Sequence, residues 1–204
     1  ANALQQALLA LTGQTFKVQE STTEKSTLQL LHNDSLKGEQ YRIETTGGFV
    51  LYAATPMGMA RATATLLQLV EKNAAGKWQL PRVKIKDEPD FSFRSFFVDM
   101  GRNPHSPETL RRVVDMMWLA KANYLHVHLS DDQLISFPST AYPKLLSQNA
   151  GWTLTDWHEM ESYSQARGVT LIPELDVPGH STILRNLYPE VFGKTPTELA
   201  TLES

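Results

Sequence analysis

Hydrophobic positions in the first 85 residues alternate between helical and strand-like patterns. Apolar residues at three-to-four spacing predict a short amphipathic helix over residues 3–12. The stretches STLQLLH and EQYRIETTGGFVLYAAT are typical of strands, and the TGG of the second stretch predicts a hairpin turn. A second helical pattern predicts a helix over residues 59–76, ending at a glycine. This order of elements predicts a small α+β domain over residues 1–85.

The pattern changes after residues 76–94, which hold two prolines and a block of charges and are predicted to be a connector. Beyond it, strands are predicted at 91–103, 123–130 and 169–176, and helices at 106–122, 155–168 and 177–190. Ser106 and Thr155 are the predicted N-caps of the first two of these helices. Strands and helices that alternate at this length indicate βαβ units and a parallel sheet.

Polar residues gather where these three predicted strands end. On the second strand, alternation places Leu125 and Val127 on one face and His126 and His128 on the other. The polar residues at or just after the strand ends are Asp99, Arg102, Asp131, Asp132, Glu174, Asp176 and His180. In parallel α/β sheets and barrels, ligands bind at the carboxyl ends of the strands. The sequence therefore predicts a site at this edge of the sheet.

Composition and charge exclude several classes of protein. The 204 residues are 41% hydrophobic and 20% charged, which is ordinary for a globular protein. A net charge of −3 provides no basic field for nucleic acid, and no apolar run reaches the roughly 18 residues that a membrane span needs. The absence of cysteine excludes disulfides and thiolate metal sites. No signal peptide is visible at the N-terminus, and the compartment stays open.

Simpler interpretations of the polar residues remain open at this point. Asp99 and Arg102 could form one ion pair that closes a strand, and aspartates after a strand are common in loops and caps. A metal-dependent hydrolase is another alternative, because His126 and His128 on one strand face resemble the spacing of zinc ligands. Such a site would need further ligands from the neighbouring carboxylates or His180.

Longer motifs resemble one family of enzymes over nearly the whole chain. The segment FRSFFVDMGRNPHSPETLRRVVDMMWLAKANYLHVHLSDDQ resembles the first barrel strand, first helix and second strand of the family 20 glycoside hydrolases, the β-N-acetylhexosaminidases. The segment GWTLTDWHEMESYSQARGVTLIPELDVPGHSTILRNLYPE resembles the continuation through the third strand. The first region resembles the small α+β domain that precedes the barrel in these enzymes. The chain departs from the family pattern at Asn103, where a histidine is usual, and at Leu134-Ile135-Ser136.

The resemblance implies a fold and a set of roles. A complete (β/α)₈ barrel takes about 250 residues, so residues 91–204 would supply about its first three β/α units and leave the barrel incomplete. By the family pattern, Arg102 grips hydroxyls of an N-acetylhexosamine ring, and His128 and Asp176 line the same pocket. Asp131 and His180 match buried polar residues that are linked to the catalytic acid. The resemblance implies no cofactor.

The family mechanism is substrate-assisted and retaining, and it needs an adjacent Asp-Glu pair after the fourth barrel strand. The sole Asp-Glu dipeptide among these residues, Asp87-Glu88, lies in the predicted connector. We therefore expect the 204-residue chain to be inactive alone, and to self-associate or to require a complementing C-terminal half. The expected partners are N-acetylhexosamine-containing glycans. The resemblance also leaves open a remnant that binds amino sugars or associates with itself without catalysis.

Overall fold

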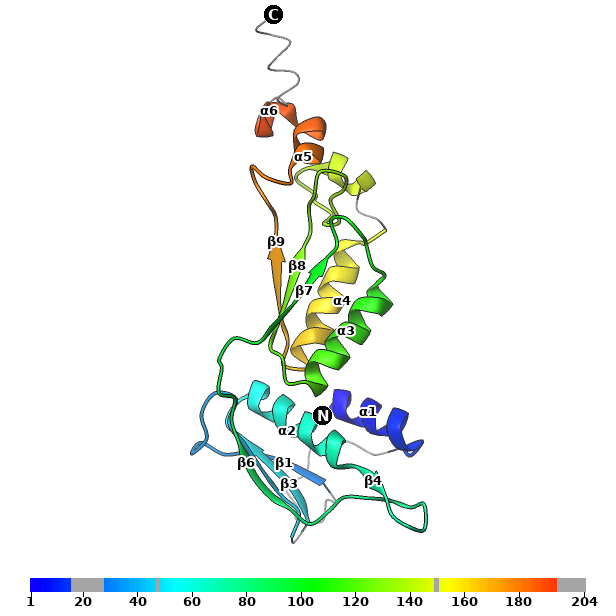
Figure 1. Ribbon diagram of the computed structural model, residues 1–204, viewed down its shortest axis with the longest axis vertical. Helices are drawn as coiled ribbons and strands as arrows, with labels where there is room; N and C mark the ends of the chain where they lie inside the picture. Colours follow the sequence, from blue (N-terminus) through cyan, green and yellow to red (C-terminus); the bar gives the residue numbers. More distant parts are fainter. Residues whose placement is uncertain (16–27, 47, 149–150, 194–204) are drawn as a thin grey trace, which may run out of the picture. The chain divides into compact units, whose positions relative to one another are not determined.

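A computed structural model describes residues 1–15, 28–46, 48–148 and 151–193. The chain divides into two compact units that are each discontinuous in sequence (Figure 1). Unit 1 comprises residues 1–94, 114–123 and 165–169, and unit 2 comprises residues 95–113, 124–164 and 170–204. Among the described residues, no helix is both long enough and apolar enough to cross a membrane.

Unit 1 is built on a four-stranded sheet with two helices. The helices are α1 (Asn2–Thr12) and α2 (Pro56–Leu69). The strands, in sheet order, are β1 (Leu28–His32), β3 (Phe49–Ala53), β2 (Tyr41–Glu44) and β6 (Lys84–Asp87). Strands β2 and β3 are antiparallel neighbours, which confirms the predicted hairpin, although Gly47 lies outside the described residues.

The core of unit 1 forms where α2 packs on this sheet. Ile43 and Leu51 are fully buried on neighbouring strands, and small alanines on α2 allow the helix to approach closely. Trp118, from the 114–123 segment, packs into the same core and donates its indole N–H to the carbonyl of Ala60 at 2.9 Å. Arg61 of α2 donates to the carbonyl of Gly168 at 2.6 Å. Both later segments therefore belong to this unit through side-chain hydrogen bonds as well as packing.

Two predictions for this part of the chain were wrong. Helix α2 ends at Leu69, and residues beyond it form a short hairpin of β4 (Glu71–Lys72) and β5 (Trp78–Gln79). The Asn73 side chain accepts from two backbone N–H groups of the intervening turn, an alternative to helical hydrogen bonding that asparagine favours. The predicted connector also contains β6, an edge strand paired with β2. The domain boundary near residue 85 stays a prediction.

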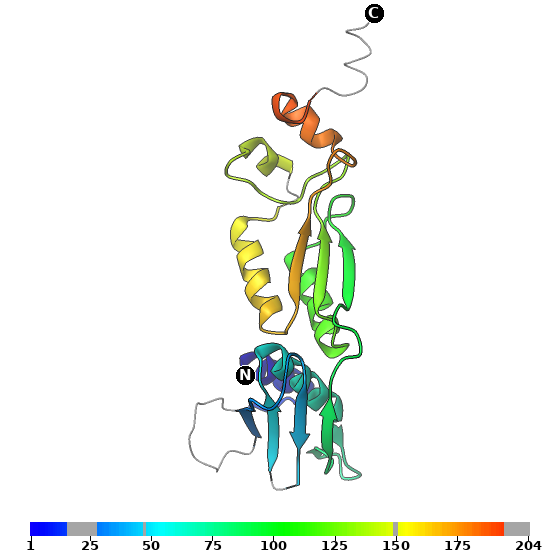
Figure 2. The ribbon, with the colours of Figure 1, turned by 90° about the vertical axis from the view of Figure 1, so that its left-hand side faces the viewer.

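Unit 2 is built on a parallel sheet in the order β7, β8, β9, as predicted (Figure 2). The strands are β7 (Ser95–Asp99), β8 (Tyr124–His128) and β9 (Thr170–Glu174). The connecting elements are α3 (Pro107–Leu119), the 3₁₀ helix η1 (Pro143–Gln148) and α4 (Leu154–Gln165), and α5 (Thr182–Leu187) and α6 (Pro189–Phe192) follow β9. The α/β fold class is confirmed, and within the described residues the sheet does not close into a barrel.

The predicted faces of β8 are confirmed by burial. Leu125 and Val127 are buried, and α4 and the first half of α3 cover one face of this sheet (Figure 1). The opposite face carries His126 and His128. The helices begin at polar caps: Ser106 Oγ accepts from the backbone N–H of Thr109, as predicted. The predicted cap Thr155 was wrong, because helix α4 begins at Leu154 and Thr153, two residues before Thr155, forms a reciprocal capping pair with Asp156.

Candidate functional site

The carboxyl ends of the three parallel strands bring the predicted polar residues together in unit 2. Asp99, His128 and Glu174 are register partners on β7, β8 and β9. Because side chains in register on adjacent strands point to the same face, these three side chains lie in one row. The loops that follow the strands supply Arg102, Asp131 and His180, and all three contact one another around this row.

Arg102 lies half-exposed between two carboxylates. Asp99 accepts from the backbone N–H of Arg102 at 2.8 Å and from its Nη1 at 2.7 Å, and Asp131 Oδ2 lies 2.7 Å from Nη2. Burial raises the pKa of Asp99, but hydrogen bonds from the Arg102 backbone and guanidinium outweigh it and lower the pKa. The hydrogen bond to Asp99 likewise raises the pKa of Arg102. The guanidinium is therefore a fixed, charged donor at the edge of the site.

Asp131 is the buried centre of the cluster, with a side chain only 3% exposed. Its Oδ1 accepts from the backbone N–H of Asp132 at 2.6 Å. Its Oδ2 is approached by Arg102 Nη2, by His180 Nδ1 at 3.1 Å and by His128 Nε2 at 3.6 Å. One carboxylate thus holds an arginine and a histidine that are both about half-exposed, which suits a polar ligand rather than an apolar one.

Gly101 explains how the loops after β7 and β8 approach so closely. A Cβ at this position would lie 2.8 Å from the carbonyl carbon of Ser130 and 2.9 Å from the backbone nitrogen of Asp131. Only glycine fits that spacing without displacing the backbone that carries Asp131. Asp132, next in sequence, has a different task. Its Oδ1 accepts from the backbone and hydroxyl of Thr182, at the start of α5.

Glu174 bridges the two histidines of β8. One carboxylate oxygen, Oε2, pairs with His126 Nε2, and the other, Oε1, lies 2.5 Å from His128 Nδ1. The Phe97 ring packs against both imidazoles, with ring centroids 5.1 Å and 5.9 Å away. The sequence pattern placed Glu174 at the strand end, but it could not show that this carboxylate orients both rings.

The five residues expected to form the site are therefore brought together. Arg102, His128, Asp131 and His180 are linked by direct contacts. Asp176 has a carboxylate oxygen within 4.8 Å of ligand atoms of His128 and Glu174. In the described part of the chain, the two groups with metal-ligating spacing are His128, Glu174 and Asp176, and Asp131, Asp132 and His180. Neither contains both His126 and His128, and each of these imidazoles contacts a different oxygen of Glu174. That geometry does not favour the metal alternative.

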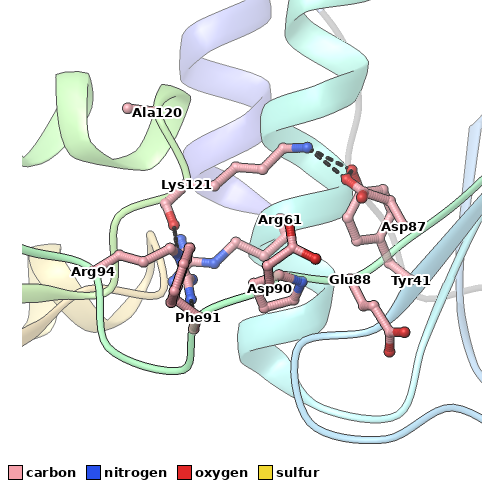
Figure 3. A pocket seen from close by; sticks show the side chains of 10 residues that line it. Tyr41, Arg61, Asp87, Glu88, Asp90, Phe91, Arg94, Ala120 and Lys121 are labelled. Atoms are coloured by element: carbon pink, nitrogen blue, oxygen red, sulfur yellow. Dashed lines mark hydrogen bonds and ion pairs between the residues drawn. The ribbon is translucent and has the colours of Figure 1, made fainter.

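A separate pocket of about 260 Å³ lies in unit 1, and Figure 3 shows its lining. Its basic groups contact groups of the protein itself: Lys121 Nζ contacts Asp87 at 2.8 Å and the hydroxyl of Tyr41 at 2.7 Å. Arg61 and Arg94 both pair with the carboxylate of Glu39. Because the three basic side chains of the pocket are paired with carboxylates of the protein, we interpret these contacts as structural.

Comparison with known proteins agrees with the geometry of the strand ends. Residues 91–203 match the catalytic domain of glycosyl hydrolase family 20, and residues 1–88 match domain 2 of the same family. A β-hexosaminidase of Akkermansia muciniphila is 34% identical over 184 residues, covering 81% of this chain and 37% of the relative. A β-hexosaminidase of Emericella nidulans is 36% identical over 151 residues, covering 70% of this chain and 25% of the relative.

Solved structures give the same result. The β-N-acetylhexosaminidase of Bacteroides fragilis superposes with a TM-score of 0.75 at 30% identity, covering 81% of this chain and 36% of the other. The N-acetyl-β-hexosaminidase of Streptomyces plicatus gives a TM-score of 0.80 at 26% identity, covering 93% and 41%. The chain thus spans well under half the length of these relatives. The matches to both family domains, together with the 34% identity to the Akkermansia muciniphila relative, show that the chain belongs to glycoside hydrolase family 20, the β-hexosaminidase family.

Proposed function

We propose that the cluster around Arg102 and Asp131 binds a terminal N-acetylhexosamine. The observation that carries this proposal is the half-exposed guanidinium of Arg102, fixed on two carboxylates at the carboxyl ends of the strands. A planar guanidinium held in this way offers its remaining N–H groups in a fixed direction, which suits the adjacent hydroxyls of a sugar ring. His128 and Asp176 would line the same pocket.

The substrate class is supported by a relative. A mutant of the Streptomyces plicatus β-hexosaminidase, 26% identical to this chain, has been solved in complex with its product GlcNAc. We propose that this chain forms part of an enzyme that removes terminal N-acetylhexosamine by substrate-assisted retaining hydrolysis, in which the 2-acetamido oxygen attacks the anomeric carbon. Asp131 and His180 would then be linked to the acid that protonates the leaving oxygen.

We further propose that these 204 residues bind sugar without hydrolysing it. The Asp87-Glu88 dipeptide lies in unit 1, where Asp87 pairs with Lys121. Without an Asp-Glu pair at the site, neither acid catalysis nor orientation of the acetamido group is available. Within the described residues, β7 and β9 each pair with β8 alone, so each leaves an open edge. Such edges favour self-association or a complementing C-terminal half that supplies further β/α units.

The binding proposal is tested with GlcNAc, GalNAc and glucose on the 204-residue chain, by ligand-observed NMR. We expect weak binding of an N-acetylhexosamine, weaker binding of glucose, and more than about tenfold loss of affinity in Arg102→Ala. Arg112→Ala is the matched control, because Arg112 is exposed and pairs with Glu108 on the same helix. Equal binding by both variants, or no binding by the wild type, would contradict the proposal.

Hydrolysis and assembly are tested separately. A chromogenic N-acetylglucosaminide should show no turnover with the pure 22.9 kDa chain, and clear turnover would overturn the proposed lack of activity. Light scattering of the same material should give a mass above that of one chain if the open edges associate. Sugar binding without turnover, even when a longer C-terminal half is added, would favour the amino-sugar-binding remnant over the hydrolase.

A further inference from the structure

His128 lies between two carboxylates, those of Glu174 and Asp131. His128 is buried, with a side chain only 5% exposed, and its ring is enclosed by Phe97, Glu174 and His180. Its Nδ1 is directed at Glu174 Oε1 at 2.5 Å, so Nδ1 carries a proton and donates a hydrogen bond to this carboxylate. The other ring nitrogen, Nε2, is buried and has Asp131 Oδ2 as a neighbour at 3.6 Å.

The protonation state of His128 therefore determines whether a lone pair or an N–H group at Nε2 faces the carboxylate of Asp131. A neutral imidazole that donates from Nδ1 presents a lone pair at Nε2, which opposes the carboxylate of Asp131. A protonated imidazole donates from both nitrogens and lies between two carboxylates. The charged and titratable groups that face this ring from the surrounding elements are Asp99, Arg102, His126, Asp131, Glu174, Asp176 and His180.

We propose that Glu174 is a positioning residue, which holds His128 protonated and aimed at Asp131 and so fixes the carboxylate on which Arg102 and His180 depend. Glu174 itself does not need to touch the sugar. Only the effect on sugar affinity rests on the proposed function; the effect on His128 stands without it.

The electrostatics agree with this geometry. Burial lowers the pKa of His128, but the hydrogen bond and negative charge of Glu174, together with smaller contributions from Asp99 and Asp131, outweigh burial and raise it. The hydrogen bond from His128 in turn lowers the pKa of Glu174. Since the folded-state pKa of His128 is raised, the protonated arrangement is complete below the ordinary value of about 6.5. It is lost as pH rises through the raised value. Sugar binding at Arg102 should weaken over the same range.

The experiment follows the His128 ring by NMR of the 204-residue chain with ¹⁵N- and ¹³C-labelled histidine, assigned by loss of its signals in His128→Gln. We expect a titration midpoint above about 6.5 in the wild type. In Glu174→Gln the midpoint should fall by about one pH unit or more. Glu159→Gln is the matched control: it removes the same charge from an exposed glutamate of α4 that pairs with Arg111. A midpoint that is unchanged in Glu174→Gln, or lowered equally by both substitutions, would overturn the inference.

Two further measurements keep the test decisive. If Glu174→Gln does not fold, the wild-type ¹⁵N shifts above the midpoint still identify the protonated nitrogen of neutral His128. A proton on Nδ1 supports the inference, and a proton on Nε2 overturns it. GlcNAc affinity, measured in parallel, should fall in Glu174→Gln and with rising pH. If the wild type does not bind GlcNAc, the proposed function fails, while the titration still decides the role of Glu174.

Discussion

A carboxylate that is buried or largely buried and surrounded by cations occurs in both units, at Glu39 in unit 1 and at Asp131 in unit 2. Glu39 accepts from Arg61 Nε at 2.5 Å, from Arg94 Nη2 at 2.6 Å and from Asn123 Nδ2 at 3.0 Å. The arginines are themselves buried or largely buried, with side chains 1% and 21% exposed. The donors come from three separate segments of unit 1, so this cluster holds those segments together.

The cluster around Asp131 has similar chemistry and the opposite exposure. The side chain of Asp131 is 3% exposed, against 11% for Glu39, but the side chains of Arg102 and His180 are 49% and 45% exposed. Donors that are fixed by a buried acceptor and still face solvent can exchange water for a ligand at little cost in ordering. The comparison teaches that exposure of the partners, rather than burial of the acid, separates a binding cluster from a structural one.

The largest effect should come from removing the structural carboxylate. Glu39→Ala would leave the guanidinium of Arg61 buried without its counter-charge, which costs about 3–5 kcal/mol of unfolding free energy. Urea unfolding followed by circular dichroism measures this loss. Glu44→Ala is the control, because Glu44 pairs with the more exposed Arg42, and such pairs contribute about 1 kcal/mol or less.

The contribution of Glu39 to the unfolding free energy should depend on pH. Burial raises the pKa of Glu39, but hydrogen bonds from Arg61 and Arg94 and their positive charges outweigh it and lower the pKa. A depressed folded-state pKa means that the stabilisation is present above the ordinary value of about 4.3 and is lost as pH falls through the folded value. The difference in unfolding free energy between wild type and Glu39→Ala should shrink in acid. A difference that stays constant would contradict this account.

A smaller effect is expected where two loops of unit 2 meet. Gly101→Ala places a methyl group 2.8 Å from the Ser130 carbonyl carbon, and overpacking of this kind costs about 1–3 kcal/mol. Because the displaced backbone carries Asp131, GlcNAc binding should weaken together with stability. Gly179→Ala is the control in the same unit, since its added methyl meets no atom within 4 Å. If both variants bind and unfold alike, close packing at Gly101 does not position Asp131.

The sequence was sufficient for the framework of unit 2. Apolar alternation on β8 predicted which face is buried, and the polar strand ends predicted where the site lies, because both follow from backbone periodicity. The pattern failed at residues 71–87. The turn there depends on side-chain hydrogen bonds of Asn73. Strand β6 is a short edge strand whose lysines are exposed, so it carries only one apolar residue, Ile85, as a signal.

Roles that depend on individual atoms could not be predicted from residue types. Glu174 and His128 are 46 positions apart, and periodicity places them in one row without showing that one carboxylate reaches two rings. In the same way, Asp131 and Asp132 are adjacent residues of the same type, so the sequence alone does not distinguish their roles. One is buried at the centre of the cluster and the other caps α5, because adjacent side chains point in different directions.

The smallest effect should come from replacing Asp99, the more exposed of the two carboxylates that pair with Arg102. Asparagine at this position can still accept from the backbone N–H of Arg102, but it offers no charge to the guanidinium. Asp99→Asn should therefore change unfolding less than Gly101→Ala does and weaken GlcNAc binding about threefold, since Arg102 loses part of its anchoring. Isothermal titration calorimetry and urea unfolding measure the two quantities.

The sign of the pH dependence sharpens this last test. Because hydrogen bonds from Arg102 lower the folded-state pKa of Asp99 despite its burial, the charged pair stabilises the fold above the ordinary value of about 3.9. That contribution is lost as pH falls through the lower folded value, so the wild type and Asp99→Asn should converge in acid. Asp34→Asn, an exposed site in unit 1, removes an equal charge without touching the Arg102 pair. If Asp99→Asn destabilises the fold as much as Glu39→Ala, exposure of the partners does not separate the two clusters.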